Sequence, residues 1–292
     1  MHGVLVIDKP GGITSHDVVN RVRRIAQTRK VGHLGTLDPL ATGVLPLVIG
    51  RATRLAQFFT ANTKTYEAVI EFGYSTDTYD CEGTARSEFR EPAFDQATLE
   101  EQLNAFRGTF LQTPPPVSAK KVAGVRAYQL ARQKLPVVLE PVEVNVEVEL
   151  IGFTGKLARL TLRCSAGTYV RSIAHDLGQR LGCGAFVRSL RRTISGDFTI
   201  AQAHTLDRLA EMAACGQLEQ ALIPAASLLP HFPETRIDAG TESNIRQGKD
   251  FRLSPFRPDP GARFIKAISE SGNLVAIGEA RLPHLYHPVL VL

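Results

Sequence analysis

The sequence is poor in cysteine, with four among its 292 residues: Cys81, Cys164, Cys183 and Cys215. No two of them are spaced as a CxxC pair, which argues against a zinc knuckle and against a dithiol redox motif. They are also too few and too scattered for a disulfide framework in a chain of this length. We therefore expect reduced, buried thiols in a cytoplasmic protein.

Long apolar runs are also missing. The longest apolar stretches, such as Val44–Ile49, are much shorter than the roughly 20 residues that a helix needs to span a bilayer. The apolar segment Gly3–Ile7 ends at Asp8, Lys9 and Pro10, far short of the hydrophobic part of a signal peptide. We expect no association with a membrane.

Several motifs of common enzyme classes are absent. The sequence has no GxxxxGK[ST] phosphate loop, no GxGxxG after a strand, no GxSxG elbow, no HExxH and no HxE…PCxxC deaminase pattern. His284 and His287 are spaced like metal ligands, but no cysteine or carboxylate lies near them in sequence, which favours a surface loop. The sequence therefore predicts neither a metal nor a cofactor.

The composition is that of an ordinary globular protein with a small positive excess. Hydrophobic residues make up 43% of the chain and charged residues 22%, with 34 Lys and Arg against 29 Asp and Glu. A net charge of +5 permits a polyanionic partner such as RNA without requiring one. The length allows a large core and two domains.

The hydrophobic pattern predicts a mixture of strands and helices. Val4–Ile7 is typical of a short buried strand, and Thr14 or Ser15 can cap a following helix whose polar positions carry several arginines. Further strands are expected at Val44–Ile49, Tyr66–Phe72, Val142–Leu150 and Leu157–Leu162, and further helices at Thr53–Phe59, Thr98–Arg107, Val170–Leu181 and Thr205–Ala214. Without regular βαβ alternation, this order predicts an α+β fold with a central, mainly antiparallel sheet flanked by helices. A composition break at Leu229–Glu234 predicts domains at 1–230 and 231–292, the second small and β-rich.

One loop stands out by its glycines, its prolines and its single acid. Residues 32–47 read GHLGTLDPLATGVLPL, in which the glycines permit unusual backbone angles and close approach of a ligand to Asp38. An isolated Asp-Pro pair is usually an ordinary turn. The whole string, however, closely resembles motif II of the TruB family of pseudouridine synthases, in which this aspartate is the essential catalytic residue.

The resemblance extends over most of residues 3–200. Similar family strings occur, in order, at 6–15 (VIDKPGGITS), 64–68 (KTYEA), 76–83 (TDTYDCEG), 114–132 (PPPVSAKKVAGVRAYQLAR), 164–171 (CSAGTYVR) and 190–192 (LRR). The resemblance implies the pseudouridine synthase fold, with an RNA-gripping "thumb" insertion at about 112–141. Residues after about Phe232 loosely resemble the family's small, β-barrel-like PUA domain.

The resemblance also implies an activity and a set of site residues. The family isomerises uridine 55 in the T loop of tRNA without a cofactor, by glycosidic bond cleavage, base rotation and C–C bond formation. Asp38 is expected to act as nucleophile or as base, and the sequence leaves both open. The other residues implied at the site are His33, Tyr66, Tyr169, Arg171 and Leu190 for the substrate, and Asp80 for RNA. Outside the site, the basic pair Lys120 and Lys121 is expected to contact RNA.

Two alternatives share these motifs. The first is the related catalytic subunit of guide-RNA ribonucleoproteins, and the second is a non-catalytic protein that binds or refolds RNA. The long 110–140 insertion and the start of the chain close to its first strand favour a stand-alone enzyme over the former. Intact Asp38, Tyr66 and Arg171 argue against the latter. The expected partner is therefore the T stem-loop of tRNA, with no obligate protein partner.

Overall fold

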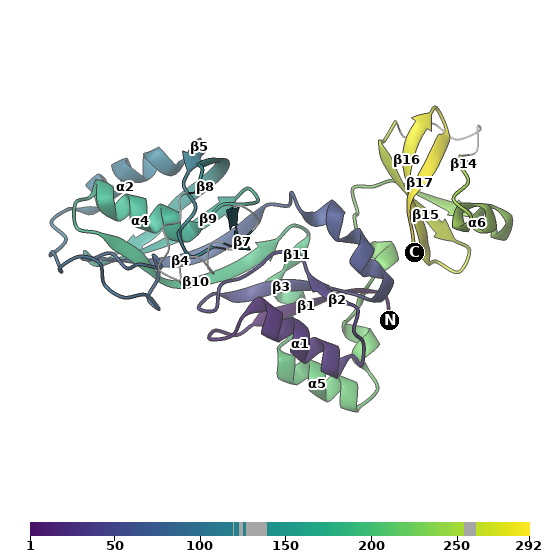
Figure 1. Ribbon diagram of the computed structural model, residues 1–292, viewed down its shortest axis with the longest axis horizontal. Helices are drawn as coiled ribbons and strands as arrows, with labels where there is room; N and C mark the ends of the chain where they lie inside the picture. The colour runs from purple at the N-terminus through teal and green to yellow at the C-terminus, as the bar shows by residue number, and fades with distance from the viewer. Residues whose placement is uncertain (119, 123–124, 127–138, 254–260) are drawn as a thin grey trace.

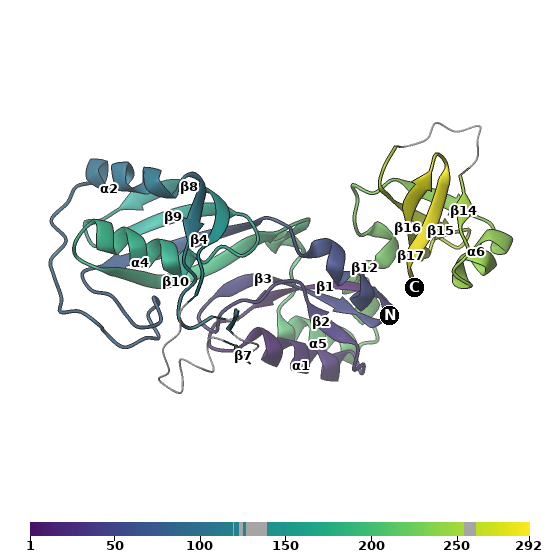
Figure 2. The same ribbon diagram turned by 45° about the horizontal axis from the view of Figure 1, so that its top comes forward.

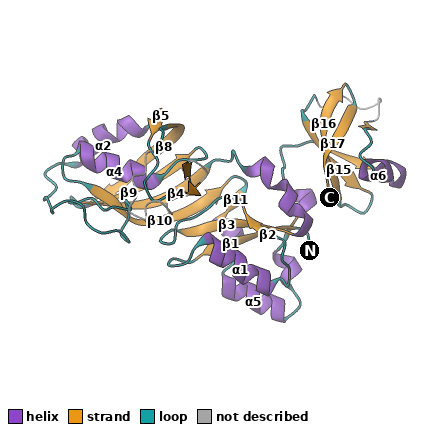
Figure 3. Cartoon of the chain, in the orientation of Figure 1, coloured by secondary structure: helices purple, strands orange, loops and turns teal. Residues whose placement is uncertain are grey.

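The computed structural model describes residues 1–292 except 119, 123–124, 127–138 and 254–260. Figure 1 shows two β-rich bodies, a large one that contains the N-terminus and a small one formed by the C-terminal strands. Figure 3 shows helices packed against both bodies. This arrangement confirms the α+β class expected from the sequence. Among the described residues, none of the helices is long and apolar enough to cross a membrane.

The large body is built on a sheet of ten strands. The order along its main path is β12 (Ile223–Pro224), β1 (Gly3–Lys9), β3 (Thr42–Ile49), β10 (Ala185–Ser195), β4 (Lys64–Phe72), β9 (Leu157–Cys164), β8 (Val142–Phe153) and β5 (Gly108–Gln112). Off this path, β2 (Val31–His33) pairs with β3 and β11 (Phe198–Thr199) with β10. Within this sheet the parallel pairing is that of β10 with β3, and the other described pairs are antiparallel.

Helices cover different parts of this sheet, as Figure 2 shows. The helices α1 (Ser15–Ile25) and α5 (Leu206–Ala214) lie beside β1 and β3, whereas α2 (Gln96–Leu103) and α4 (Val170–Arg180) cover β4, β9 and β8. Thr14 caps α1 through a capping box with Asp17, and Val18, Val19 and Val22 are buried on its inner face. The shorter elements are η1 (Gly50–Phe59), η2 (Asn104–Phe106), η3 (Ile200–Gln202), η4 (Leu218–Ala221), η5 (Ala225–Ser227), β6 (Lys121–Val122) and β7 (Val125–Arg126).

As far as its residues are described, the small C-terminal body is a five-stranded sheet with one helix. Its strand order is β13 (Glu234–Ile237), β15 (Phe264–Ser269), β16 (Leu274–Leu282), β17 (Leu285–Val291) and β14 (Phe251–Arg252), and its helix is α6 (Ala239–Arg246). The two bodies share a hydrophobic cluster, in which Phe58 of η1 makes edge contacts with Phe232 and Phe264, each at 5.5 Å between ring centroids. The domain boundary at 230/231 and the assignment of the small body as a PUA domain stay predictions.

Two of the expected elements need correction, and several strands of the large sheet were not expected, among them β2, β5 and β10. The helix placed at 98–107 begins at Gln96, because Asp95, not Thr98, accepts the capping hydrogen bond, and it ends at Leu103, where η2 follows. The expected helix at 53–59 is a 3-10 helix that begins at Gly50. Strand β10 joins the two halves of the sheet, whereas the sequence pointed only to the 190–192 string in this region and no strand was expected there.

Candidate active site

Asp38 lies in the loop between β2 and β3, at the wall of a cavity of about 290 Å³. The residues around the cavity come from four regions of the chain that are far apart in sequence: the Asp38 loop, residues 60–66 before and within β4, the segment 165–171 before and within α4, and strand β10. The side chain of Asp38 is one-third exposed. A carboxylate at this position can reach a ligand in the cavity while the protein holds its other side.

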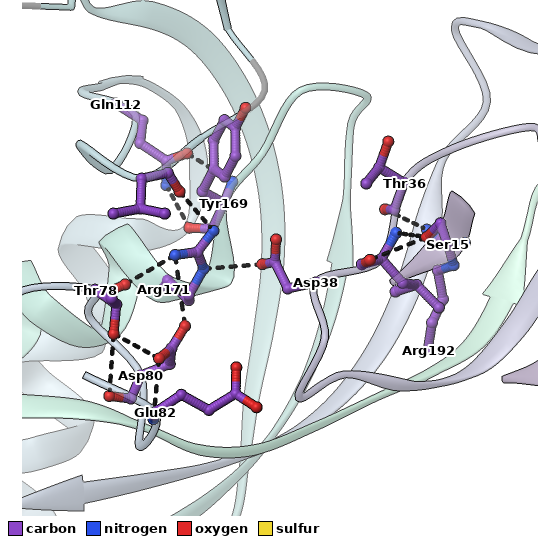
Figure 4. Close-up of polar contacts among 12 residues, drawn as sticks. Ser15, Thr36, Asp38, Thr78, Asp80, Glu82, Gln112, Tyr169, Arg171 and Arg192 are labelled. Atoms are coloured by element: carbon purple, nitrogen blue, oxygen red, sulfur yellow. Dashed lines mark hydrogen bonds and ion pairs between the residues drawn. The ribbon is translucent and has the colours of Figure 1, made fainter. Parts of the chain in front are cut away.

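Arg171, in the first turn of α4, holds that other side (Figure 4). Its Nε atom lies 2.9 Å from Oδ2 of Asp38. The Nε–H is not aligned with the oxygen, so the contact is an ion pair and not a directed hydrogen bond. The guanidinium is almost fully buried, and its remaining nitrogens donate to the carbonyl oxygens of Thr78 at 2.8 Å and Val117 at 3.0 Å.

Asp80 is a second, deeply buried acid beside the same guanidinium. Its Oδ2 lies 3.5 Å from Nη1 of Arg171, and its Oδ1 accepts hydrogen bonds from the Thr78 hydroxyl at 2.6 Å and the Glu82 backbone N–H at 3.1 Å. Burial raises the pKa of Asp80, although the hydrogen bond from Thr78 and the charge of Arg171 oppose the rise. Its placement favours support of Arg171 over the RNA contact that was expected for it.

The Asp38 loop is itself fastened by a buried lysine. Lys9, at the end of β1, has no exposed surface, and its Nζ donates to the carbonyl oxygens of Ala41 at 2.7 Å, Pro10 at 2.9 Å and Pro39 at 3.1 Å. Burial lowers the pKa of Lys9 to about 8, and the charge of Asp38 opposes this fall. The amine therefore remains charged at neutral pH, and its three donors are matched to three acceptors, two in the Asp38 loop and one in the turn after β1.

Ser15 and Arg192 hold the loop on the other side of Asp38 (Figure 4). The Ser15 hydroxyl donates to the carbonyl of Leu37 at 3.0 Å and accepts from the N–H of the same residue at 2.8 Å. Arg192 is buried, and it donates to the carbonyl oxygens of Val44, Gly35 and Thr36, which lie at 2.7, 3.0 and 3.4 Å. Lys9, Ser15 and Arg192 were not among the residues expected at the site.

Gly43 explains how Arg192 comes so close to the loop. It has a φ of +97°, and a Cβ atom there would lie 2.2 Å from the carbonyl oxygen of Arg192. A glycine is therefore required where β3 and β10 meet in parallel, with Gly43 opposite Arg192. This fit places the guanidinium of Arg192 within reach of the Asp38 loop.

Of the other residues expected at the site, three line the cavity with Asp38 and Arg171. They are Tyr66 on β4, Leu190 on β10 and Tyr169, which directly precedes α4. Burial raises the pKa of both tyrosines, so their phenols are neutral at physiological pH. Gln112, which was not expected, fixes the backbone of Tyr169: it donates to the carbonyl at 3.1 Å and accepts from the N–H at 2.8 Å.

The structure does not bring all expected residues to the cavity. His33 lies on β2 opposite Leu47 and is not among the lining residues, and neither is Lys120. The side chain of Lys121 lies outside the described residues, as does much of the 112–141 insertion. In the described part of the chain, no group of three or more His, Cys, Asp or Glu side chains could hold a metal ion.

Comparison with protein families identifies the chain. The model of the TruB family pseudouridylate synthase N-terminal domain matches residues 23–170, and that of the tRNA pseudouridylate synthase B C-terminal domain matches residues 171–230. The chain belongs to the TruB family of pseudouridylate synthases. A TruB relative from Solibacter usitatus, named tRNA pseudouridine synthase B, is 58% identical over the full length of both chains. Another with that name, from Aquifex aeolicus, is 40% identical over 96% of each chain.

Solved structures share the fold of this TruB-family chain. A chain in the crystal structure of a Cbf5-Nop10-Gar1 complex is similar with a TM-score of 0.71 and 26% identity, over 97% of this chain and 79% of that one. A chain of the archaeal box H/ACA sRNP Nop10-Cbf5 complex gives a TM-score of 0.70 at 23% identity, over 99% and 85%. The pseudouridine synthase fold expected from the sequence is thereby confirmed.

Proposed function

We propose that this chain converts uridine to pseudouridine at position 55 in the T loop of tRNA, with Asp38 as its catalytic residue. The observation that carries the proposal is the Asp38 carboxylate, held by Arg171 at the wall of a cavity of about 290 Å³. Relatives named tRNA pseudouridine synthase B, which match nearly the whole chain, support tRNA as the substrate. The position within tRNA comes from the family resemblance of the motifs.

The reaction rearranges one nucleotide and needs no co-reactant. The C1′–N1 bond breaks, the uracil turns, and a C1′–C5 bond forms; C5 then loses a proton and N1 gains one. Arg171 lies against Oδ2 of Asp38, so Oδ1 is the oxygen left for the nucleotide. That oxygen can attack as a nucleophile or remove a proton as a base, and both roles agree with the geometry.

The target base has to leave its stack to reach Asp38, which costs a few kcal/mol. A cavity of about 290 Å³ has the size of a site for one base. Tyr66 and Leu190 give it an aromatic and an aliphatic wall, and a ring stacked on the base offsets part of the cost of extrusion. Lys64, which also lines the cavity, adds positive charge for a phosphate.

The test is an assay on an unmodified tRNA transcript, without added nucleotide, in which pseudouridine is mapped by mass spectrometry. The wild type, Asp38→Asn and the exposed control Asp197→Asn are compared, with RNA binding measured in parallel. We expect product at the T-loop uridine for the wild type and the control. Asp38→Asn should bind the RNA with similar affinity and form no product.

Each other outcome changes the proposal in a defined way. Robust turnover by Asp38→Asn would remove Asp38 from the chemistry. Pseudouridine at another position would correct the substrate. Product that forms only after guide RNA and partner proteins are added would favour the ribonucleoprotein subunit. Refolding of tRNA that survives Asp38→Asn would add a second role to the enzyme.

A further inference from the structure

An aromatic stack lies behind Arg171, and the chemistry above does not use it. Tyr79, in the 76–83 segment, stacks on His175 of α4 with 3.8 Å between ring centroids and 10° between ring planes. Both side chains are partly buried. Neither residue lines the cavity, and neither contacts Asp38 in the described contacts. The stack therefore joins a loop to a helix and makes no direct contact with the reacting groups.

The backbone at Tyr79 has an unfavourable conformation. Its φ of +64° lies in the left-handed region, which a bulky residue rarely adopts. Such a conformation persists only where the surrounding contacts impose it. Two backbone hydrogen bonds help: the Val187 N–H donates to the Tyr79 carbonyl at 3.0 Å, and the Cys81 N–H donates to the Val187 carbonyl at 3.0 Å. The ring stack on His175 is the contact made by the Tyr79 side chain itself.

The residues on both sides of Tyr79 hold Arg171, together with the carbonyl of Val117. Thr78 offers its carbonyl oxygen to Nη1 at 2.8 Å, and the Asp80 carboxylate lies 3.5 Å from the same nitrogen. On the helix, His175 is four residues after Arg171, so both side chains are on the same face of α4. The stack and the guanidinium thus connect the same loop to the same helix, one turn apart.

We propose that the Tyr79–His175 stack is a positioning element for Arg171. The stack holds the 78–80 backbone, with its strained residue Tyr79, against α4. In this position Thr78 and Asp80 fix the guanidinium that lies against Asp38. Nδ1 of His175 is buried and makes no hydrogen bond among the described residues, so stacking sets the orientation of the ring. Burial also lowers the pKa of His175, which favours the neutral ring. The consequence for turnover rests on the function proposed above.

Three substitutions at Tyr79 separate the effect of the ring stack from the effect of the strained backbone conformation. Tyr79→Phe keeps the stack, and its kcat should stay within about twofold of the wild type. Tyr79→Ala keeps the strained φ but loses the stack, and its kcat should fall roughly tenfold, since one aromatic pair contributes on that scale. Tyr79→Gly loses the stack but also the strain, so its kcat should lie between these values. KM for tRNA should stay within about twofold, because Tyr79 and His175 do not line the cavity.

Substitutions at His175 test whether the two rings act together. His175→Ala should lower kcat as much as Tyr79→Ala, and the double variant should be no slower than either single one. The control is Phe153→Leu, which breaks another stack, that of Phe153 on Phe94 at 5.4 Å between centroids. Neither of these residues lines the cavity, so the control should lower the melting temperature and leave kcat unchanged.

Amide hydrogen exchange tests the same proposal without any turnover. The N–H groups of Cys81 and Val187 form the hydrogen bonds that join the 76–83 segment to β10. They should exchange roughly tenfold faster in Tyr79→Ala and His175→Ala, but not in Tyr79→Phe. A wild type that forms no pseudouridine would overturn the proposed function, and exchange would still decide whether the stack holds the segment. Unchanged exchange would overturn the proposal. Faster exchange with unchanged kcat would overturn it as well. An equal fall in kcat in Phe153→Leu and in the Tyr79→Ala and His175→Ala variants would also overturn it.

Discussion

Lys9→Met is expected to leave the Asp38 loop without its central support. Methionine has a similar length but no charge and no donor, so the carbonyls of Pro10 and Ala41 lose their hydrogen bonds, whereas that of Pro39 keeps the N–H of Gly12 at 2.9 Å. A buried carbonyl left without a donor costs about 1–3 kcal/mol. Relief from burying a charge offsets part of this loss. We expect a net loss of about 2 kcal/mol in the free energy of unfolding, and a melting temperature lower by roughly 4–8 °C.

The effect on catalysis should exceed the effect on stability. A shift of Asp38 by about 1 Å costs on the order of 100-fold in rate, so we expect kcat of Lys9→Met to fall between roughly 10-fold and 100-fold. KM for tRNA should change little, because Lys9 has no exposed surface to offer to RNA. Single-turnover kinetics on a tRNA transcript, with the exposed Lys249→Met as control, measure both values. Wild-type kcat in Lys9→Met would refute the idea that Lys9 positions Asp38.

Two further predictions concern pH and the contact between β3 and β10. The pKa of Lys9 falls from 10.5 in the unfolded chain to about 8 in the folded protein. Between pH 8 and pH 10.5 the unfolded chain therefore binds more protons than the folded one. The contribution of Lys9 to the free energy of unfolding should rise over this range, by roughly 3 kcal/mol in total. Urea unfolding should show this rise as a difference in the free energy of unfolding between the wild type and Lys9→Met. A difference that does not change with pH would contradict it. Gly43→Ala should destabilise the protein by more than about 2 kcal/mol in the same assay, because its Cβ would strike the backbone of Arg192. Gly152→Ala is the matched control, since a Cβ there meets no atom within 4 Å; an equal loss in both variants would refute the clash.

Much of the fold follows from local patterns that the sequence displays. Strand β8 alternates strictly between buried and exposed residues, and α1 carries its own capping box, so both were predicted close to their observed bounds. Strand β10 was missed because register shifts between Val187 and Ser189 and between Arg192 and Ile194 interrupt the alternation. A sequence pattern gives no sign of a bulge that only the neighbouring strand imposes.

The candidate site also has a part that the sequence predicted and a part that it did not. The residues that face the cavity, Asp38, Tyr66 and Leu190, lie in strings that resemble family motifs, and the sequence therefore pointed to them. Lys9 and Arg192, which hold the loop from behind, also lie in such strings, but they belong to residue types that are almost never fully buried, and no structural role was expected for them. Their burial depends on the hydrogen bonds that they donate to backbone carbonyls of a loop distant in sequence, and only the tertiary structure shows these contacts.

The parallel contact between β3 and β10 also has a consequence for the order in which the protein becomes active during its synthesis. Asp38 and most of its loop are made early, but the guanidinium that fastens Gly35 and Thr36 belongs to Arg192, and the strand partner of Thr42 is Arg191. Contacts between such distant parts of a chain form slowly and late. A nascent chain that stops before β10 already contains Asp38 and Arg171, yet it lacks the strand that closes the site, so an incomplete translation product should be unable to modify RNA.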